Sequence, residues 1–179
     1  WSPFWQKKEA TSTDRLFTSM EDFMEADAAQ RQEVLSLVPQ QPPFRFIDEI
    51  ISLDDERIVG AYRFRVDEYF YRGHFPGHPV TPGVILIETM AQVGVVAFGI
   101  YLLSRQKNMK LRDMKLPVSL FSLADRVEFG QMVKPGERVV VKANKIYFRK
   151  MTMKAGVFME RENGEIICSG ELSGVGVEP

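Results

Sequence analysis

The sequence predicts an α+β fold in which an antiparallel β-sheet is wrapped around one long central helix, with a helical extension at the N-terminus. Three observations support this prediction. The first is that the sequence contains about six strand-like segments separated by short turns. The second is one long predicted helix with a segment that is apolar on every side. The third is that the chain is long enough for one domain. The 179 residues are 45% hydrophobic, which suffices for a single packed core. We therefore expect an extension over residues 1–32 and one domain over residues 33–179.

The N-terminal extension shows helical periodicity. A helix is predicted from about Asp14 to Ala26, because apolar residues recur at helical spacing, namely Leu16, Phe17, Met20, Phe23 and Met24. A second short helix is expected from Asp27, since Gln30 stands three residues later in a capping-box pattern. Its predicted buried side consists of Val34, Leu35 and Val38. The sequence PQQPPF then ends it, because proline cannot continue a helix.

The strand-like segments lie on both sides of the central helix in the sequence. Two of them, residues 46–54 and 57–66, flank a short Asp-Asp-Glu turn and predict a hairpin. Four more follow the helix, at residues 119–129, 137–148, 150–161 and 165–175. The connections KPGE and ENGE contain residues typical of tight turns. Such short connections favour antiparallel pairing.

The central helix is predicted from Pro82 to about Arg105, a length of ~36 Å at ~1.5 Å per residue. Its segment from Val93 to Leu103 is apolar all round, so the helix must be wrapped by other elements. That segment is well below the ~20 residues that span a membrane, which favours a core helix. Gly94 and Gly99 are unfavourable inside a helix, and we expect them to allow close approach of a sheet or of a second copy of the helix.

The charge balance and the cysteine content limit the possible partners. The 23 Lys and Arg residues nearly balance the 24 Asp and Glu residues, which argues against nucleic acid or an anionic membrane as the main partner. The single cysteine, Cys168, excludes an intrachain disulfide and a cysteine-rich zinc site. It fits a reducing compartment, so we expect a cytoplasmic location. No intact signal peptide is visible at the N-terminus, and a removed one remains an open alternative.

The segment RGHFPGHPVTPGVILIETMAQ, residues 72–92, gathers both histidines and three of the ten prolines of the chain. The prolines, Pro76, Pro79 and Pro82, hold the loop extended and non-helical. His74 and His78 are therefore not a helical metal-binding pair, and we expect no metal site. At the start of the helix the backbone N–H groups of Gly83 and Val84 lack helical partners, which makes this corner suitable for a carbonyl oxygen or an oxyanion.

Glu88 lies in the second predicted turn of the central helix, among aliphatic neighbours and without a nearby cation. An apolar setting raises the pKa of a carboxyl, as a general acid near neutral pH requires. Gln92, one turn later, can hold it by a hydrogen bond. The alternative is that Glu88 only complements the helix dipole and that the histidines are structural. The grouping of a base, an acid and an oxyanion site at one corner favours the catalytic interpretation.

The stretch GHFPGHPVTPGVILIETMAQ closely resembles the signature of the FabZ-type 3-hydroxyacyl-[acyl-carrier-protein] dehydratases, which have the hotdog fold. LVPQQPPFRFIDEI resembles the opening segment of that family, and VKPGERV through ICSGEL resembles its closing strands. The similarity extends from about Glu33 to Val175. It implies dehydration of a 3-hydroxyacyl thioester to the trans-2-enoyl thioester, in fatty-acid or polyketide-like biosynthesis.

The resemblance also implies roles for individual residues. His74 and Glu88, fourteen residues apart, match the catalytic pair of the family. The N–H groups of Gly83 and Val84 would bind the thioester oxygen, with Gln92, Phe75 and Pro82 as supporting residues. We expect an acyl tunnel walled by the central helix and by the aromatic run Tyr69, Phe70 and Tyr71. His78 is assigned to structure.

Further implications concern the assembly and the substrate carrier. The resemblance implies a homodimer with a shared sheet, with a trimer of dimers as the larger assembly that the family often forms. It implies no cofactor, and a substrate linked to acyl carrier protein, with coenzyme A left open. Because the prolines stiffen the His74 loop, we expect His74 to reach Glu88 of a second subunit. The basic segment from Arg105 to Lys115 is either a solvated loop or a docking site for an acidic carrier protein.

Several positions depart from the usual pattern of the family, namely Thr81, Thr89 and the run Gly130, Gln131 and Met132. These departures leave the catalytic pair intact, and they leave the acyl chain length open. Two other activities compete with dehydration. A hotdog thioesterase would direct water at the thioester carbonyl, and a non-catalytic hotdog protein would bind an acyl group without turnover.

Overall fold

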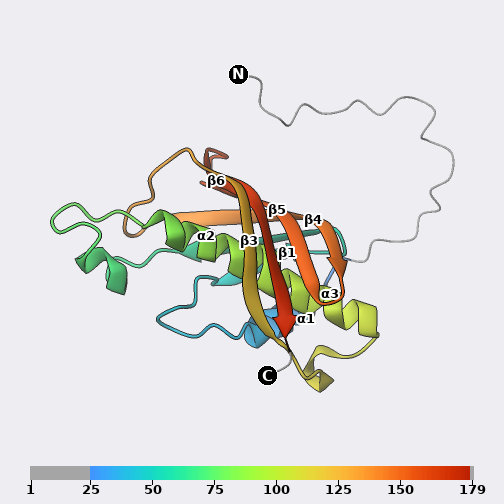
Figure 1. Ribbon diagram of the computed structural model, residues 1–179. Coiled ribbons are helices and arrows are strands. Elements are labelled where there is room, and N and C mark those ends of the chain that lie inside the picture. Colours follow the sequence, from blue (N-terminus) through green and yellow to red (C-terminus); the bar gives the residue numbers. More distant parts are fainter. Residues whose placement is uncertain (1–24, 178–179) are drawn as a thin grey trace.

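The structure, a computed structural model, describes residues 25–177 of the chain (Figure 1). Most of the helix predicted over residues 14–26 lies outside the described residues. The next predicted helix is confirmed as α1, Ala28–Leu37. Its capping box is present, with the Gln30 N–H donating to Asp27 Oδ1 at 2.8 Å and the Asp27 N–H donating to Gln30 Oε1 at 3.0 Å. The predicted buried side is also confirmed, by Val34, Leu35 and Val38.

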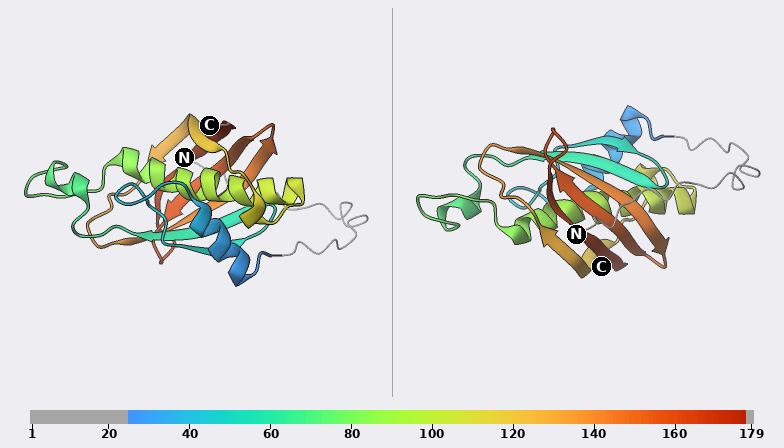
Figure 2. Two further views of the ribbon diagram at one scale, coloured as in Figure 1. Left: turned by 90° about the horizontal axis from the view of Figure 1, so that it is seen from below. Right: turned by 90° about the horizontal axis from the view of Figure 1, so that it is seen from above.

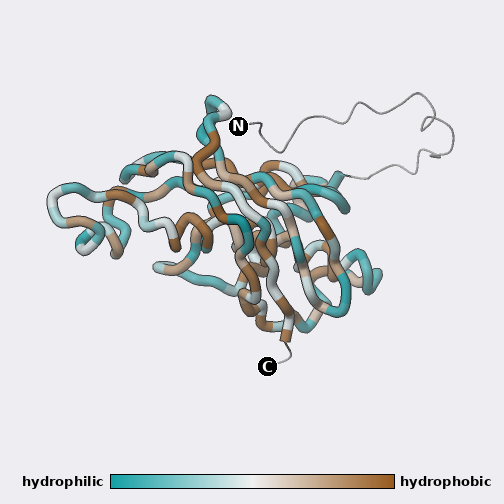
Figure 3. The backbone as a smooth tube through the Cα atoms, turned by 45° about the horizontal axis from the view of Figure 1, so that its top comes forward, coloured by the Kyte–Doolittle hydropathy of each residue, from teal (hydrophilic) through white to brown (hydrophobic). Residues whose placement is uncertain are grey.

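All six predicted strands are present in one antiparallel sheet. They are β1 Glu49–Leu53, β2 Arg57–Arg63, β3 Val118–Phe129, β4 Arg138–Arg149, β5 Thr152–Glu160 and β6 Ile166–Val177. Their order across the sheet is β1-β2-β4-β5-β6-β3, so β1 and β3 are the edge strands. The predicted hairpin of β1 and β2 is confirmed by their antiparallel register. The turns that join the later strands are mostly hydrophilic (Figure 3).

The sheet curls around the predicted central helix, as Figures 1 and 2 show. This helix consists of α2 Gly83–Ala91, a π-helical stretch Gln92–Ala97 and α3 Phe98–Lys107. The prediction that Pro82 is its first helical residue is wrong by one position. Pro82 has an extended ψ of 138° and caps the helix, because its carbonyl accepts the N–H groups of Ile85 and Leu86.

At Gly94 the central helix lies directly against the sheet. A Cβ atom built there would lie 2.8 Å from Val157 and 2.9 Å from Ala143, distances that real Cβ atoms do not show. The predicted close approach is therefore confirmed for Gly94. At Gly99 the corresponding Cβ would make only an ordinary contact of 3.8 Å with Met153, so the sheet does not require glycine there. The alternative, close approach of a second copy of the helix at Gly99, stays a prediction.

The central helix, Gly83–Lys107, is long and apolar enough to cross a membrane by length and composition alone. However, 72% of its apolar window is buried within the fold. This burial is what the core helix of a sheet-wrapped protein shows, and it agrees with the prediction from the sequence.

The connection between β2 and α2 contains a short 3-10 helix, η1 Tyr69–Arg72. It projects from one end of the body, beyond the sheet and the start of the central helix (Figures 1 and 2). A second 3-10 turn, η3 Leu111–Asp113, follows the helix at the opposite end. The projecting connection carries His74, so the fold presents this side chain away from the core.

Candidate active site

His74 is held within the projecting loop by three hydrogen bonds. Its N–H donates to Phe70 O at 3.0 Å, and its carbonyl accepts the N–H of Val80 at 3.0 Å. Its ring Nδ1 lies 2.9 Å from Val80 O. Since a carbonyl oxygen only accepts, Nδ1 must carry the hydrogen, and in the neutral ring Nε2 then has a free lone pair. The loop therefore fixes both the orientation and the tautomer that a general base requires.

Tyr71 and Thr81 close the base of this loop. Their hydroxyl oxygens lie 2.7 Å apart, and both side chains are buried. The backbone N–H of Thr81 also donates to Val133 O at 2.8 Å, which ties the loop to the main body. Thr81 is one of the positions that depart from the family pattern, and here its hydroxyl has a defined partner.

The other predicted loop residues have more exposed positions. The Phe75 ring stacks on the His74 ring, with centroids 4.1 Å apart and an interplanar angle of 27°, and its side chain is 55% exposed. His78 is exposed, and its backbone N–H donates to Phe75 O at 2.9 Å. Within residues 25–177, no three His, Cys, Asp or Glu side chains lie close enough together to hold a metal ion.

Glu88 is half-buried on α2, and Gln92 contacts it directly. The side-chain Nε2 of Gln92 donates to Glu88 Oε1 at 2.8 Å and to Phe44 O at 2.9 Å, while its Oε1 accepts the Phe46 N–H at 2.7 Å. Burial raises the pKa of the Glu88 carboxyl above its usual value, and the hydrogen bond from Gln92 partly opposes that rise. The shift is in the direction that a general acid requires.

The first turn of α2 presents two free backbone donors. The carbonyl of Pro82 accepts from Ile85 and Leu86, so the N–H groups of Gly83 and Val84 have no helical acceptor. Val84 is 72% exposed, and the Phe129 ring of β3 lies against Gly83. This corner can accept a carbonyl oxygen that approaches from outside the chain.

The structure does not join His74 to Glu88 within one chain. Among the described residues the two side chains share no hydrogen bond, and the His74 Nδ1 is directed at Val80. The projecting loop with His74 and the side of α2 with Glu88 are therefore two candidate half-sites, which no hydrogen bond joins among the described residues.

The aromatic run forms a row in η1. Ring centroids are 5.2 Å apart for Tyr69 and Phe70 and 4.6 Å apart for Phe70 and Tyr71. Phe70 also lies 6.3 Å from Phe46, next to the segment that holds Gln92. None of these three aromatic residues lines the apolar cavity that lies farther along the central helix and is described next. Their predicted part in an acyl tunnel stays a prediction.

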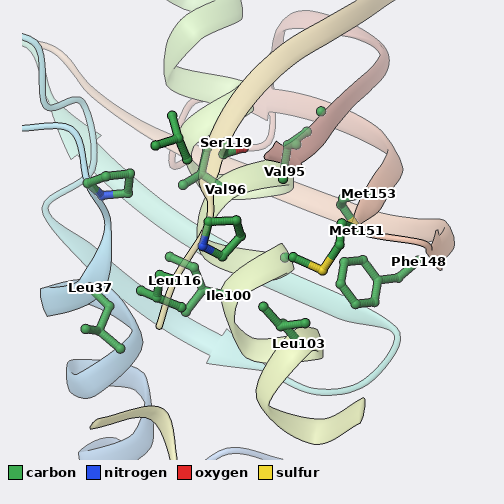
Figure 4. A pocket seen from close by; sticks show the side chains of 16 residues that line it. Leu37, Val95, Val96, Ile100, Leu103, Leu116, Ser119, Phe148, Met151 and Met153 are labelled. Carbon is green, nitrogen blue, oxygen red and sulfur yellow. The ribbon is translucent and has the colours of Figure 1, made fainter. Parts of the chain in front are cut away.

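That apolar cavity lies beside the C-terminal half of the central helix (Figure 4). It encloses about 230 Å³, and Ser119 is its single polar side chain. The other walls come from the end of α1, the start of β3, and the facing parts of β4, β5 and β6. Reasoning from the sequence missed this cavity, because its walls come from segments far apart in the chain. The only local signal was Gly99 within a helix, which also lines it.

Comparison with known proteins gives the family of the chain. The sequence profile of the FabA-like domain matches residues 38–172. The chain is 33% identical over 141 residues to the 3-hydroxyacyl-[acyl-carrier-protein] dehydratase FabZ of Caldicellulosiruptor bescii, covering 78% of this chain and 93% of the relative. It is 37% identical over 144 residues to the protein of the same name from Syntrophomonas wolfei, covering 79% and 91%.

A solved structure supports the fold assignment independently. The dehydratase heterocomplex ApeI:P from Xenorhabdus doucetiae aligns with a TM-score of 0.67 at 14% identity, covering 81% of this chain and 91% of that chain. At this identity the likeness shows the hotdog fold alone, whereas the sequence relatives show the family. The chain belongs to the FabA-like family of hotdog-fold proteins.

Proposed function

We propose that the protein is a FabZ-type dehydratase that removes water from 3-hydroxyacyl thioesters in fatty-acid biosynthesis. The observation that carries this proposal is the pair of half-sites in a FabZ-like chain. One holds an imidazole with a free Nε2, and the other holds a carboxyl whose pKa is raised by burial. Dehydration next to a thioester needs one base and one acid, and this pair supplies both.

His74 is the proposed base. Its Nε2 takes the proton from C2 of the substrate, and the electron pair of the C2–H bond forms the enolate of the thioester. The Nδ1–H bond to Val80 O then stabilises the positive charge that develops on the imidazolium. The N–H groups of Gly83 and Val84 would stabilise the negative charge on the thioester oxygen.

Glu88 is the proposed acid. As the enolate collapses, C2 and C3 form a double bond and the bond from C3 to its hydroxyl breaks. The Glu88 carboxyl gives its proton to that hydroxyl, which leaves as water. His74 is then protonated and Glu88 is ionised, so transfer of one proton from the histidine to the carboxylate, through solvent, restores the starting state.

A homodimer would bring the two half-sites together. The outer edge of β3 is unpaired in the described chain, and this strand exposes several large apolar side chains, namely Val118, Leu120, Phe121, Leu123 and Phe129. An exposed apolar edge strand invites pairing with another strand. A second copy that pairs edge to edge would make a shared sheet. It would also supply a surface for the projecting loop, so that His74 of one subunit meets Glu88 of the other.

The proposed substrate carrier is acyl carrier protein, because the names of the sequence relatives specify it. The proposed location is the cytoplasm. Cys168 is a free, buried thiol whose pKa is raised by burial to about 11, and such a thiol is stable in a reducing compartment.

Mass spectrometry of a 3-hydroxyacyl thioester after incubation tests the proposed reaction. Loss of one water with the thioester intact supports a dehydratase. Release of the free acid would instead identify a thioesterase, and an unchanged substrate would indicate a binding protein without turnover. A Glu88→Gln protein serves as the control for background elimination.

A further inference from the structure

Tyr62 and Glu68 form a buried polar pair that the proposed chemistry does not use. Tyr62 lies on β2 and is 2% exposed, and Glu68 stands directly before η1 and is 9% exposed. The Tyr62 hydroxyl donates to Glu68 Oε1 at 2.5 Å. Burial, and after it the hydrogen bond with Glu68, raises the pKa of Tyr62, so its hydroxyl keeps the proton that it donates. Burying a carboxyl group is unfavourable, so its presence here calls for an explanation.

Glu68 joins the sheet to the projecting connection. Its side chain is bonded to Tyr62 on β2, a strand that is held on both sides, by β1 and β4. Its Oε1 also accepts the N–H of Arg65 at 3.2 Å. Its backbone carbonyl accepts the N–H of Tyr71 at 3.1 Å, at the start of η1. One residue therefore connects a strand of the sheet with the first turn of η1.

η1 in turn holds His74. The carbonyl of Phe70 accepts the His74 N–H at 3.0 Å. The bond between the His74 ring and Val80 O lies within the connection, so it orients the ring without fixing the connection on the body. The exit of the connection is fixed at Thr81, and its entry is fixed at Glu68. These two anchors determine where the imidazole is presented.

The ring of Tyr62 has a second contact, on the side of the proposed acid. It meets the Phe46 ring edge-on, with centroids 5.6 Å apart and an interplanar angle of 83°. The Phe46 N–H donates to Gln92, which donates to Glu88. The hydroxyl and the ring of one tyrosine thus serve different half-sites. A variant that removes only the hydroxyl therefore isolates the effect on the base.

We infer that Tyr62 and Glu68 are positioning residues for the proposed base, because their hydrogen bond fixes the entry of the connection that carries His74. This inference rests on the proposed dehydratase function. Neither residue is assigned a contact with the reacting atoms or with the acyl chain. Their loss should therefore lower kcat and leave KM nearly unchanged.

The first test uses single variants with a 3-hydroxybutyryl thioester. Tyr62→Phe keeps the ring, and we expect kcat to fall about tenfold with KM within about twofold, since displaced catalytic groups lose rate steeply. Glu68→Leu has no acceptor and should show the same loss. Glu68→Gln retains an oxygen that accepts from Tyr62, so it should keep kcat within about threefold. Equal kcat values for Tyr62→Phe and the wild type, or for the glutamine and leucine variants, would overturn the inference.

The second test separates positioning from stability. Tyr62→Phe leaves a buried carboxyl without its donor and should lower Tm. The double variant Tyr62→Phe/Glu68→Leu removes both partners, so its Tm should rise above that of Tyr62→Phe while kcat stays low. Ser173→Ala is the matched control, because the Ser173 hydroxyl is buried and donates to Met153 O within the sheet at 2.9 Å. It should lower Tm and keep kcat. A kcat that follows Tm across all these variants would refute a positioning role.

A third measurement reports on the connection itself and needs no turnover. The chain has only two histidines, so ¹⁵N-histidine labelling gives two backbone amide signals, and His78→Ala identifies each of them. The His74 N–H is bonded to Phe70 O, and its exchange with solvent deuterium reports opening of the entry. We expect this exchange to be about tenfold faster in Tyr62→Phe and within about twofold of the wild type in Ser173→Ala.

Unchanged His74 exchange in folded Tyr62→Phe would contradict the inference, whatever the activity of the variant. If Tyr62→Phe does not fold, Glu68→Leu takes its place in all three measurements. If the wild type does not dehydrate the thioester, the proposed function fails. The exchange of the His74 amide then decides alone whether the pair holds the connection.

Discussion

The amide nitrogen of Gln92 faces the carboxylate of Glu88 at 2.8 Å, and the backbone of the chain fixes this orientation. The amide oxygen of Gln92 already accepts a hydrogen bond from the Phe46 N–H at 2.7 Å, so the amide group cannot flip without losing that bond. Gln92 is fully buried. The segment before β1 therefore positions a donor against the proposed acid.

Gln92→Met should change the pH dependence of the reaction. The hydrogen bond from Gln92 lowers the pKa of Glu88, so its loss raises that pKa further. A general acid must be protonated, and activity falls as pH rises through its pKa. We therefore expect the alkaline limb of the kcat/KM profile to move to higher pH, with a loss of roughly 1–3 kcal/mol in the free energy of unfolding from the unsatisfied backbone groups.

The control for this prediction is Thr89→Val. Thr89 is also fully buried on α2, but its hydroxyl donates to Ile85 O within the helix and does not contact Glu88. The Thr89→Val profile should match that of the wild type. An unchanged alkaline limb in folded Gln92→Met would show that the amide does not tune the carboxyl.

Replacing the proposed base or acid should remove most of the activity. We expect His74→Ala and Glu88→Gln each to lower kcat by roughly 10²–10⁴, the range for loss of a general acid or base. His78→Ala is the matched control, because the His78 side chain is exposed. Near-normal turnover of folded Glu88→Gln would contradict the assigned role.

The Glu88→Gln protein should also differ from the wild type in how its stability depends on pH. The folded-state pKa of Glu88 is raised, so folding disfavours the ionised carboxyl. Relative to Glu88→Gln, the wild-type protein should therefore lose stability as the pH rises from the usual pKa of a glutamate carboxyl through the raised pKa of Glu88 in the folded state. Urea unfolding of both proteins should show their difference growing from acidic to alkaline pH, and a constant difference would argue against the raised pKa.

Much of the fold was predictable because its signals are local. The capping box of Asp27 and Gln30 is contained within four residues, and turn residues delimit each of the six strands. The glutamate among aliphatic neighbours was equally visible, and its raised pKa has the predicted cause. Pro82 was misplaced by one residue, because a proline fits both the capping position and the first helical position.

What the sequence did not reveal depends on contacts between distant segments. The cavity has walls from α1, the central helix and four strands, and no pattern in the chain marks them as neighbours. The anchoring of Gln92 by residues Phe44 and Phe46 joins positions more than forty residues apart. The hydroxyl pair of Tyr71 and Thr81 was missed for a different reason, since an isolated threonine in a loop gives no indication of its partner.

Thr81→Val should loosen the base of the His74 loop. It leaves the buried hydroxyl of Tyr71 without its partner, which costs roughly 1–3 kcal/mol in the free energy of unfolding. We expect kcat to fall as well, because the loop that orients His74 is less firmly held, while KM changes little. Thr81→Ser keeps the hydroxyl and should restore both quantities. Equal kcat values for the valine and serine variants would show that the hydroxyl pair has no positioning role.

The basic segment from Arg105 to Lys115, which begins in the last turn of α3, is expected to attract an acidic carrier protein. Lys107 and Lys110 are both exposed there. Charge reversal at these two residues should raise KM for a carrier-linked substrate, and the effect should shrink with added salt, since exposed charges are screened over ~10 Å at 0.1 M. The matching pantetheine thioester, which has no protein surface, should keep its KM. An unchanged KM for the carrier-linked substrate would leave the segment as a solvated loop.

Mixing two inactive proteins should restore activity if the site is shared between subunits. The projecting loop carries His74 away from the body of its own chain, and no hydrogen bond joins it to Glu88 among residues 25–177. Co-refolded His74→Ala and Glu88→Gln chains would form dimers in which one composite site has both mutations and the other has neither. Random assembly makes about half of the dimers mixed, each with one good site of two, so activity should approach about a quarter of the wild-type value. Native mass spectrometry verifies that mixed dimers are present. Verified mixed dimers that remain as inactive as either parent would show that His74 and Glu88 act within one chain.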